Sequence, residues 1–318
     1  MLKSVVVLMS VAALSVGVRA ETYPSKPIML VVPFAAGGTV NMMGRLVAEH
    51  MGEMLAQPVV VDNKAGAGGA IGAGFVAKAT PDGYTLLLGS MGQAVQPLLT
   101  KRLSYDPKKL IPIGMFSTVS NVLAVSRKTP AKNVSELINY SKVSPGKLNM
   151  ASAGMGSINH LIGELFMSRT GANFVHVPYK GAGPAGVDLL SGQVQLIFAN
   201  LPNVLPFVKA GKVRLLAVAS EKRDPAIPDV PTFAEAGVKD AVVESWYGLM
   251  APAGTKPEVV KKLQDTLLIV TKDKRFISQL AEQGARPYPG SSTDMTQVIE
   301  KEGKRWGEVI DHAKISLD

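Results

Sequence analysis

The sequence predicts an α/β fold of two lobes joined by a hinge. Short runs rich in β-branched residues alternate with amphipathic stretches of helical period along most of the 318-residue chain. Such alternation is typical of a parallel sheet covered by helices. From residue 257 onward, three consecutive helices are expected with no strand of their own. These C-terminal helices must therefore pack on a sheet that is formed earlier in the chain.

The first twenty residues have the pattern of a secretory signal peptide. Lys3 precedes an uncharged, mostly apolar run over residues 4–18, and Val18-Arg19-Ala20 provides a small-residue cleavage site. The run is shorter than the roughly 20 apolar residues of a membrane span. We expect cleavage after Ala20 and export of the mature chain; a short uncleaved anchor is the alternative.

The strands and helices follow in a regular order after this leader. Strands are expected at residues 28–32, 59–61, 85–88, 122–125, 148–151, 174–176, 195–198, 215–218 and 246–250. Helices are expected at residues 42–55, 69–78, 135–142, 158–169, 184–190 and 203–210, and then at 257–272, 275–283 and 293–312.

This order divides the chain into two lobes, the first made of two separate segments and the second of one. Residues 21–121 together with 247–318 should form the first lobe, because the C-terminal helices need a sheet made earlier. Residues 122–246 should form the second lobe. The chain would then cross between the lobes twice, which makes a hinge, and binding clefts favour such interfaces.

Composition excludes several classes of protein. The absence of cysteine excludes thiol catalysis, iron–sulfur clusters and cysteine-ligated zinc. The formal charge is +9, or +7 once Lys3 and Arg19 leave with the leader (9 − 2 = 7). The basic residues are spread out and include no run of five, so nucleic-acid binding is not expected. The charge either attracts anions or has no specific role.

Three glycine-rich loops, each between a strand and a helix, have the chemistry of an anion site. They span residues 33–41, 152–157 and 178–184. Free N–H groups and the positive dipole end of the following helix point out of such loops, and glycine lets the main chain approach a ligand. Ligands of open α/β sheets bind at these ends of strands. Each loop alone could also be an ordinary glycine turn with a Ser or Thr cap.

Motifs for cofactors and catalysis are weak or absent. Gly72-Ala-Gly74-Phe-Val-Ala77 matches a dinucleotide-binding pattern but lies about ten residues after the strand that should precede it. Tight helix packing explains it better, and no cofactor is expected. There is no G-x-S-x-G elbow. His160 and Glu164 share a helix face but have no third partner, so a hydrogen bond is favoured over a metal site. An unusual enzyme or a peptide-binding chaperone remains the alternative.

Several motifs in a specific order resemble the Bug-type receptors, the periplasmic substrate-binding proteins of tripartite tricarboxylate transporters. They are Pro33-Phe-Ala-Ala-Gly-Gly38, Pro81-Asp-Gly-Tyr84, Tyr105-Asp-Pro107, Ser152-Ala-Gly-Met-Gly-Ser157, Val177-Pro-Tyr-Lys-Gly181, Ser245-Trp-Tyr-Gly248 and Ala251-Pro-Ala-Gly254. The resemblance covers essentially the whole chain after the leader. It implies a two-lobed periplasmic binding fold of type II that closes on a small carboxylate like a flytrap.

The resemblance also implies which residues bind. Loops equivalent to the first two hold a carboxylate through backbone N–H groups, hydroxyls and ordered waters. Ser90 and Asn200, at the ends of other strands, join the candidates. The expected ligand-binding residues are Phe34, Gly37, Gly38, Thr39, Asn41, Ser90, Ser152, Gly156, Ser157, Tyr179 and Asn200.

Asn41 departs from the family pattern, which usually has Asp at this position. Asp suits an ammonium group or caps a helix, whereas Asn keeps the capping oxygen without the charge. We therefore expect a ligand without an amino group, such as a di- or tricarboxylate or an aromatic acid. The other expected partner is a membrane permease or a sensor, and the receptor should be a monomer that binds no metal.

Overall fold

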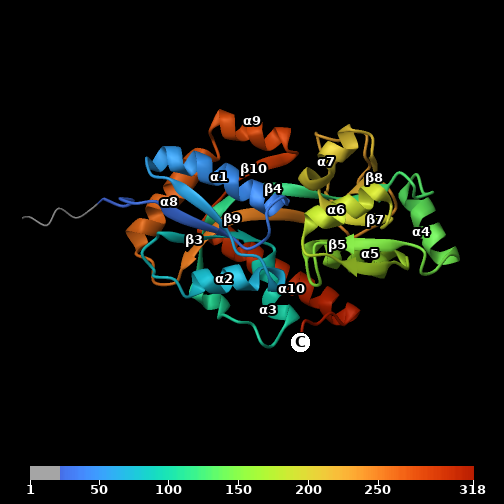
Figure 1. The fold of residues 1–318 in the computed structure, drawn as a ribbon, viewed down its shortest axis with the longest axis horizontal. Coiled ribbons are helices and arrows are strands. Elements are labelled where there is room, and N and C mark those ends of the chain that lie inside the picture. The colour runs from blue at the N-terminus through green and yellow to red at the C-terminus, as the bar shows by residue number, and fades with distance from the viewer. Residues whose placement is uncertain (1–21) are drawn as a thin grey trace, which may run out of the picture.

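The computed structural model describes residues 22–318, so the predicted signal peptide lies outside the described residues. Two lobes lie along the long axis of the molecule (Figure 1). The predicted two-lobed α/β fold is confirmed. The sheet, however, is mixed rather than parallel, because several of its strand pairs are antiparallel.

The first lobe is a sheet with helices on both faces. β1 pairs parallel with β2 and β3. β3 in turn pairs antiparallel with a strand that comes much later in the chain. Leu30 and Val32 of β1 face the core under α1 and α8 (Pro257–Val270), whereas Val31 faces the core under α2 and α3. The early elements of this lobe are β1 (Ile28–Val32), α1 (Thr39–Leu55), β2 (Val59–Asn63), α2 (Ala70–Ala77), β3 (Thr85–Ser90) and α3 (Gly92–Leu99).

The second lobe repeats this layering. β5 pairs parallel with β6 and β7, which puts the carboxyl ends of these strands at one edge. Its elements are α4 (Val134–Val143), β5 (Asn149–Ser152), α5 (Ile158–Thr170), β6 (Val175–Pro178), α6 (Ala182–Ser191), β7 (Leu196–Asn200), α7 (Leu201–Lys209) and β8 (Val213–Val218).

Two long strands connect the lobes. β4 (Leu110–Ser126) pairs with β9 (Glu244–Pro252) as far as Ser120, and from Asn121 onward it pairs with β7 and β8. β9 then returns the chain to the first lobe, where it lies between β3 and β4. The sequence predicted only the end of β4. Pro112 and Gly114 lie at a register irregularity of this strand and obscure its pattern.

The C-terminal region contains a strand that the sequence analysis did not predict. It forms α8 (Pro257–Val270), α9 (Lys274–Glu282), β10 (Ala285–Gly290) and α10 (Ser292–Ala313). β10 pairs antiparallel with β4 alone, and two of its six residues are prolines. Proline is tolerated at sheet edges but weakens the sequence signal of a strand. Helix α3 was also missed, because Pro97 interrupts its pattern.

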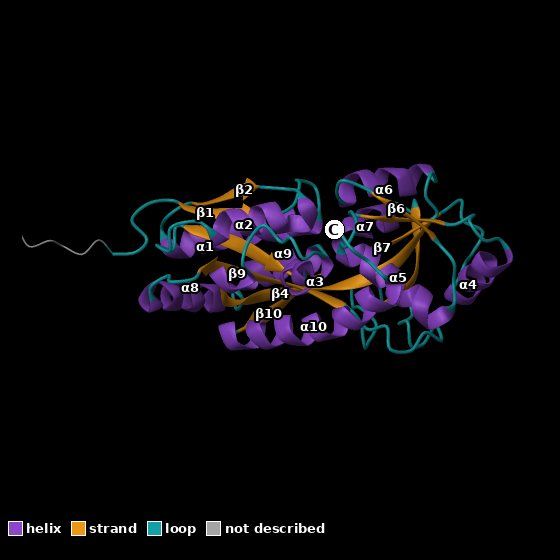
Figure 2. Ribbon diagram, turned by 90° about the horizontal axis from the view of Figure 1, so that it is seen from below, coloured by secondary structure: helices purple, strands orange, loops and turns teal. Residues whose placement is uncertain are grey.

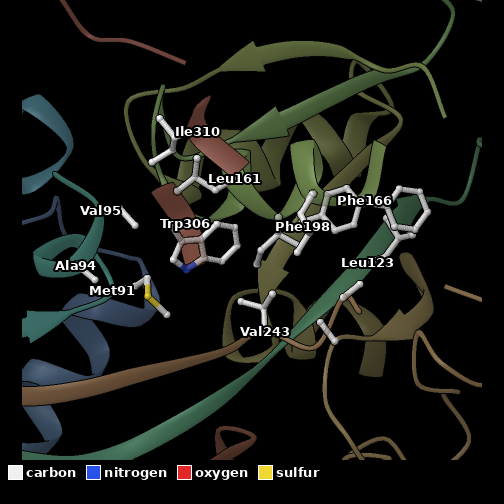
Figure 3. Packing of buried hydrophobic residues seen from close by; sticks show 14 of the residues in the cluster. Met91, Ala94, Val95, Leu123, Leu161, Phe166, Phe198, Val243, Trp306 and Ile310 are labelled. Carbon is white, nitrogen blue, oxygen red and sulfur yellow. The ribbon is translucent and has the colours of Figure 1, made fainter. Parts of the chain in front are cut away.

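Helix α10 contacts both lobes rather than the first lobe alone. It packs on α3 and β4 of the first lobe and on α5 of the second, and Figure 2 shows it running beneath the junction. The Trp306 side chain of α10 is fully buried. Its ring lies between Met91 and Val95 of the first lobe and Leu161 of the second (Figure 3). One apolar core therefore continues from lobe to lobe at this helix.

Candidate ligand-binding site

A cavity of about 90 Å³ lies between the two lobes. It is located where β1, β3, β5, β6 and β7 end, which is the edge at which open α/β sheets bind ligands. Both lobes contribute to its walls. The lining residues are Phe34, Ala35, Ala36, Gly38, Thr39, Val40, Gly68, Ser90, Met91, Gly92, Val95, Ala153, Gly156, Ser157, Ile158, Asn159, Lys180, Gly181, Ala182, Gly183, Pro184, Asn200, Asn203, Ser245, Trp246 and Tyr247.

Helices from both lobes begin at this cavity. Within residues 22–318, five N-cap residues lie in its lining: Gly38 of α1, Met91 of α3, Ser157 of α5, Gly181 of α6 and Asn200 of α7. None of these residues uses its side chain to cap its helix. Each helix start presents partial positive charge and backbone donors. An arrangement of this kind can stabilise an anion.

Helices that begin elsewhere show the contrast. Asn133 of α4, Asp273 of α9 and Ser291 of α10 each accept a backbone N–H of the first turn with their own side chains. Their donors are satisfied internally, as is usual for a stable helix start. Helices α2 and α8, whose N-caps lie outside the cavity lining, also lack a side-chain cap.

Charged side chains hardly contribute to the lining. Lys180 is the one ionisable acid or base among the residues that line the cavity, apart from the Tyr247 phenol. No Asp or Glu side chain lies there. The electrostatics of the cavity therefore depend on backbone dipoles more than on formal charges.

The two lobes touch across the cavity through Thr39 and Asn203. Asn203 is on α7, and its Oδ1 accepts the backbone N–H of Thr39 at 2.8 Å and the Thr39 hydroxyl at 2.7 Å. Nearby, a Cβ on Gly38 would lie 3.9 Å from Cβ of Ala182 in the opposite lobe. The first loop therefore lies directly against the second lobe.

A buried polar network lies at the hinge side of the cavity. Asn200 donates from Nδ2 to Oδ1 of Asn121 and to Oγ of Ser245, both at 2.8 Å. The Tyr247 hydroxyl donates to Oδ1 of Asn200 at 3.2 Å. Burial raises the pKa of Tyr247, which keeps this hydroxyl protonated as a donor. The network joins β4, β7 and β9 at the point where the lobes meet.

The family model of the tripartite tricarboxylate transporter family receptor matches residues 43–315, most of the chain. The chain belongs to this receptor family.

Related proteins align with this receptor along nearly their whole length. Protein BugT of Bordetella pertussis is 38% identical over 310 residues, which cover 96% of this chain and 94% of BugT. The solved structure of R. palustris Rpa4515 with adipate is 38% identical, with a TM-score of 0.89 over 92% of this chain and 99% of that one. MatC from Rhodopseudomonas palustris with bound malate is 33% identical, with a TM-score of 0.85 over 91% and 100%.

Seven of the residues predicted to bind a ligand line the cavity of the receptor. Gly37, Asn41, Ser152 and Tyr179 do not. The Tyr179 hydroxyl instead donates to Oδ2 of Asp188 at 2.6 Å. The seven that line the cavity are Phe34, Gly38, Thr39, Ser90, Gly156, Ser157 and Asn200.

Asn41 neither lines the cavity nor caps a helix. Helix α1 begins at Thr39 with Gly38 as its N-cap, so Asn41 already lies within the first turn. The residue is 7% exposed, and its Oδ1 has no hydrogen-bond partner among the described residues. Neither of the roles considered for this position in the sequence analysis is seen in this arrangement.

Two histidines contact the second loop, residues 152–157, and support its conformation. Ser152 Oγ lies 2.7 Å from Nε2 of His176, whose ring stacks on that of His160 at 3.8 Å. His160 Nδ1 accepts the backbone N–H of Gly156 at 3.2 Å, and its Nε2 lies 3.3 Å from Glu164. His160 and Glu164 therefore face each other on one side of α5, as their spacing predicts. Ser152 positions the loop rather than lining the cavity.

Burial and, to a smaller extent, His160 lower the pKa of His176 to about 4, against an opposing effect of Glu164. His176 is therefore neutral at neutral pH. Among residues 22–318, no cluster of three or more His, Cys, Asp or Glu side chains is placed to hold a metal ion. None of the helices in that range combines the length and apolar character that a membrane crossing requires.

Sequence reasoning missed Asn203 and did not include the Ser245–Tyr247 segment among the binding residues. The Ser245-Trp-Tyr-Gly248 motif was a signal for this segment, but nothing local placed it in the cavity. Trp246 lines the cavity, and its buried Nε1 has no partner within the described part of the chain. Asn203 offered no signal, because its importance arises from a residue 164 positions away.

Proposed function

We propose that this receptor captures a small carboxylate between its lobes and releases it chemically unchanged. The observation that carries the proposal is the convergence of five helix N-termini on one cavity without side-chain caps. Backbone N–H groups and helix dipoles stabilise a carboxylate without the need for a paired cation. The Ser157 hydroxyl, buried and without a partner in the described chain, adds a further donor.

The ligand should be an acid without an amino group. An ammonium group buried without an anion is costly, and no Asp or Glu side chain lines the cavity. Apolar side chains, among them Phe34, Met91, Val95 and Trp246, provide a surface for a hydrocarbon body. The structures with adipate and malate, from related receptors, are consistent with a dicarboxylate. An aromatic acid fits the same chemistry.

Closure of the two lobes accompanies binding in this proposal. The hinge would be the two strands β4 and β9, and the lobe boundaries would lie near residues 121 and 246, where β4 changes its pairing partner and β9 begins. Small-angle scattering tests the motion, because the radius of gyration should decrease when ligand is added. An unchanged radius at saturation would contradict closure.

We place the mature receptor in the periplasm, where it delivers its ligand to a membrane permease or a sensor. The family's receptors are periplasmic, and the predicted signal peptide suits export. The enzyme alternative has less support, because the lining includes no carboxylate or imidazole side chain for acid–base chemistry. The cavity of about 90 Å³ between the lobes also offers no room for a peptide segment.

A thermal-shift panel tests the proposed function directly. We expect the melting temperature to rise with at least one of adipate, malate, citrate or benzoate, because a ligand that binds only the folded state stabilises it. Glutamate and aspartate should have little effect. Native mass spectrometry should recover the bound acid unchanged. Stabilisation by amino acids alone, or turnover of the acid, would overturn the proposal.

A further inference from the structure

Asn203 has its side-chain amide fixed in one orientation by the opposite lobe. Its Oδ1 lies 2.8 Å from the backbone nitrogen of Thr39 and 2.7 Å from the Thr39 hydroxyl. A backbone N–H can only donate, so the atom facing it must be the amide oxygen and not the nitrogen. The Nδ2 group of Asn203 must therefore point away from Thr39.

This Nδ2 group has no hydrogen-bond partner among residues 22–318, although Asn203 lines the cavity. An amide nitrogen carries two donors and cannot accept. Around it, the lining contributes the α1 and α7 helix starts, the unpartnered Ser157 hydroxyl and no Asp or Glu side chain. A free donor in such surroundings matches a carboxylate oxygen better than any cationic group.

We propose that Asn203 is a ligand-binding residue of the second lobe that also senses closure. Its Oδ1 binds the first loop, and this bond orients Nδ2 to donate to the carboxylate of the ligand. The donor is then correctly oriented only when the lobes touch, which couples capture to closure. The inference rests on the proposed function, since it names a residue of that same site.

The competing explanation is that Asn203 only latches the lobes together. Asn203→Asp separates the two explanations, because the variant is nearly isosteric. One carboxylate oxygen can still accept both Thr39 donors, so the latch is kept or strengthened. The other oxygen can no longer donate, and its charge repels a carboxylate ligand.

The experiment measures affinity by calorimetry for adipate, malate and benzoate with the wild-type receptor and two variants. We expect Asn203→Asp to weaken binding by about 100-fold, since it loses a hydrogen bond to a charged group and adds a like charge. Its melting temperature without ligand should not fall. Asn139→Asp makes the same charge change on an exposed site of α4, outside the cavity lining, and should bind like wild type.

Each outcome bears on one claim. If the wild type binds none of the three acids, the proposed function fails. If the wild type binds and Asn203→Asp binds equally well or better, Asn203 is only a latch and the inference is overturned. If Asn203→Asp does not fold, Asn203→Ser still tests the inference, because it removes the amide donor without adding charge. That variant should bind about tenfold more weakly, and wild-type affinity would overturn the inference.

Discussion

Arg286 on β10 donates from Nη1 to Oδ2 of Asp224 at 3.0 Å and thereby connects the C-terminal strand to the second lobe. The Asp224 side chain is 4% exposed, and the same oxygen accepts the Ser120 hydroxyl at 2.6 Å. Arg286 also pairs with Glu244 at the start of β9. The ion pair therefore lies where both connecting strands pass between the lobes.

Arg286→Leu should reduce the free energy of unfolding by about 3 kcal/mol, because it leaves the Asp224 carboxylate buried without its cation. Urea denaturation measures the change. Arg275→Leu is the matched control, since its partner Glu53 and Arg275 itself are each about half exposed. An exposed pair of this kind contributes little to stability, because solvent screens it. Equal losses in the two variants would contradict a structural role for the hinge ion pair.

Ser157→Ala should weaken ligand binding while leaving the unliganded receptor as stable as before. The Ser157 hydroxyl is buried without a partner among the described residues, so removing it breaks no bond of the unliganded protein. Removing a donor to a carboxylate costs roughly 1–3 kcal/mol of affinity. Calorimetry with adipate and a melting curve without ligand measure the two effects. Unchanged affinity would remove Ser157 from the site.

Gly38→Val should abolish binding, whereas Gly38→Ala should bind with modest loss. Gly38 has an extended backbone that any residue adopts, and a Cβ there would contact Ala182 at an ordinary 3.9 Å. The additional methyl groups of valine would extend into the gap between the lobes and hinder closure. Calorimetry ranks the two variants. Wild-type affinity of the valine variant would show that the first loop does not approach the ligand.

His176→Gln should reduce the loss of stability at mildly acidic pH. The folded pKa is about 4 and the ordinary value is 6.5, so between them the unfolded chain binds a proton that the folded protein does not. The free energy of unfolding therefore falls as the pH drops from 6.5 toward 4, by about 1–2 kcal/mol at pH 5 for this half-buried ring.

Urea denaturation at pH 7 and pH 5 measures this dependence. His312→Gln is the control, because His312 is exposed on α10 and its loss should not protect the receptor from acid. Equal acid sensitivity of wild type and His176→Gln would rule out His176 as the responsible group.

Local pattern predicted most elements of the fold but failed where proline and polar residues occupy strands. The prolines of β10 and the irregular start of β4 hide the period of two that marks a strand. β10 becomes a strand because it pairs with β4, as Ala285 does with Val119, and the start of β4 becomes one because it pairs with β9. That pairing is a property of the folded sheet and not of either segment.

The sequence by itself determined the order of most strands and helices, the glycine-rich loops and the family resemblance, because these depend on neighbouring residues. Only the tertiary structure decided which residues meet in the cavity. It directed Ser152 and Tyr179 to His176 and Asp188, and it brought Asn203 to Thr39. The physical reason is that these contacts depend on how the two lobes meet at the hinge. A hydrogen bond between residues 164 positions apart leaves no trace in local periodicity.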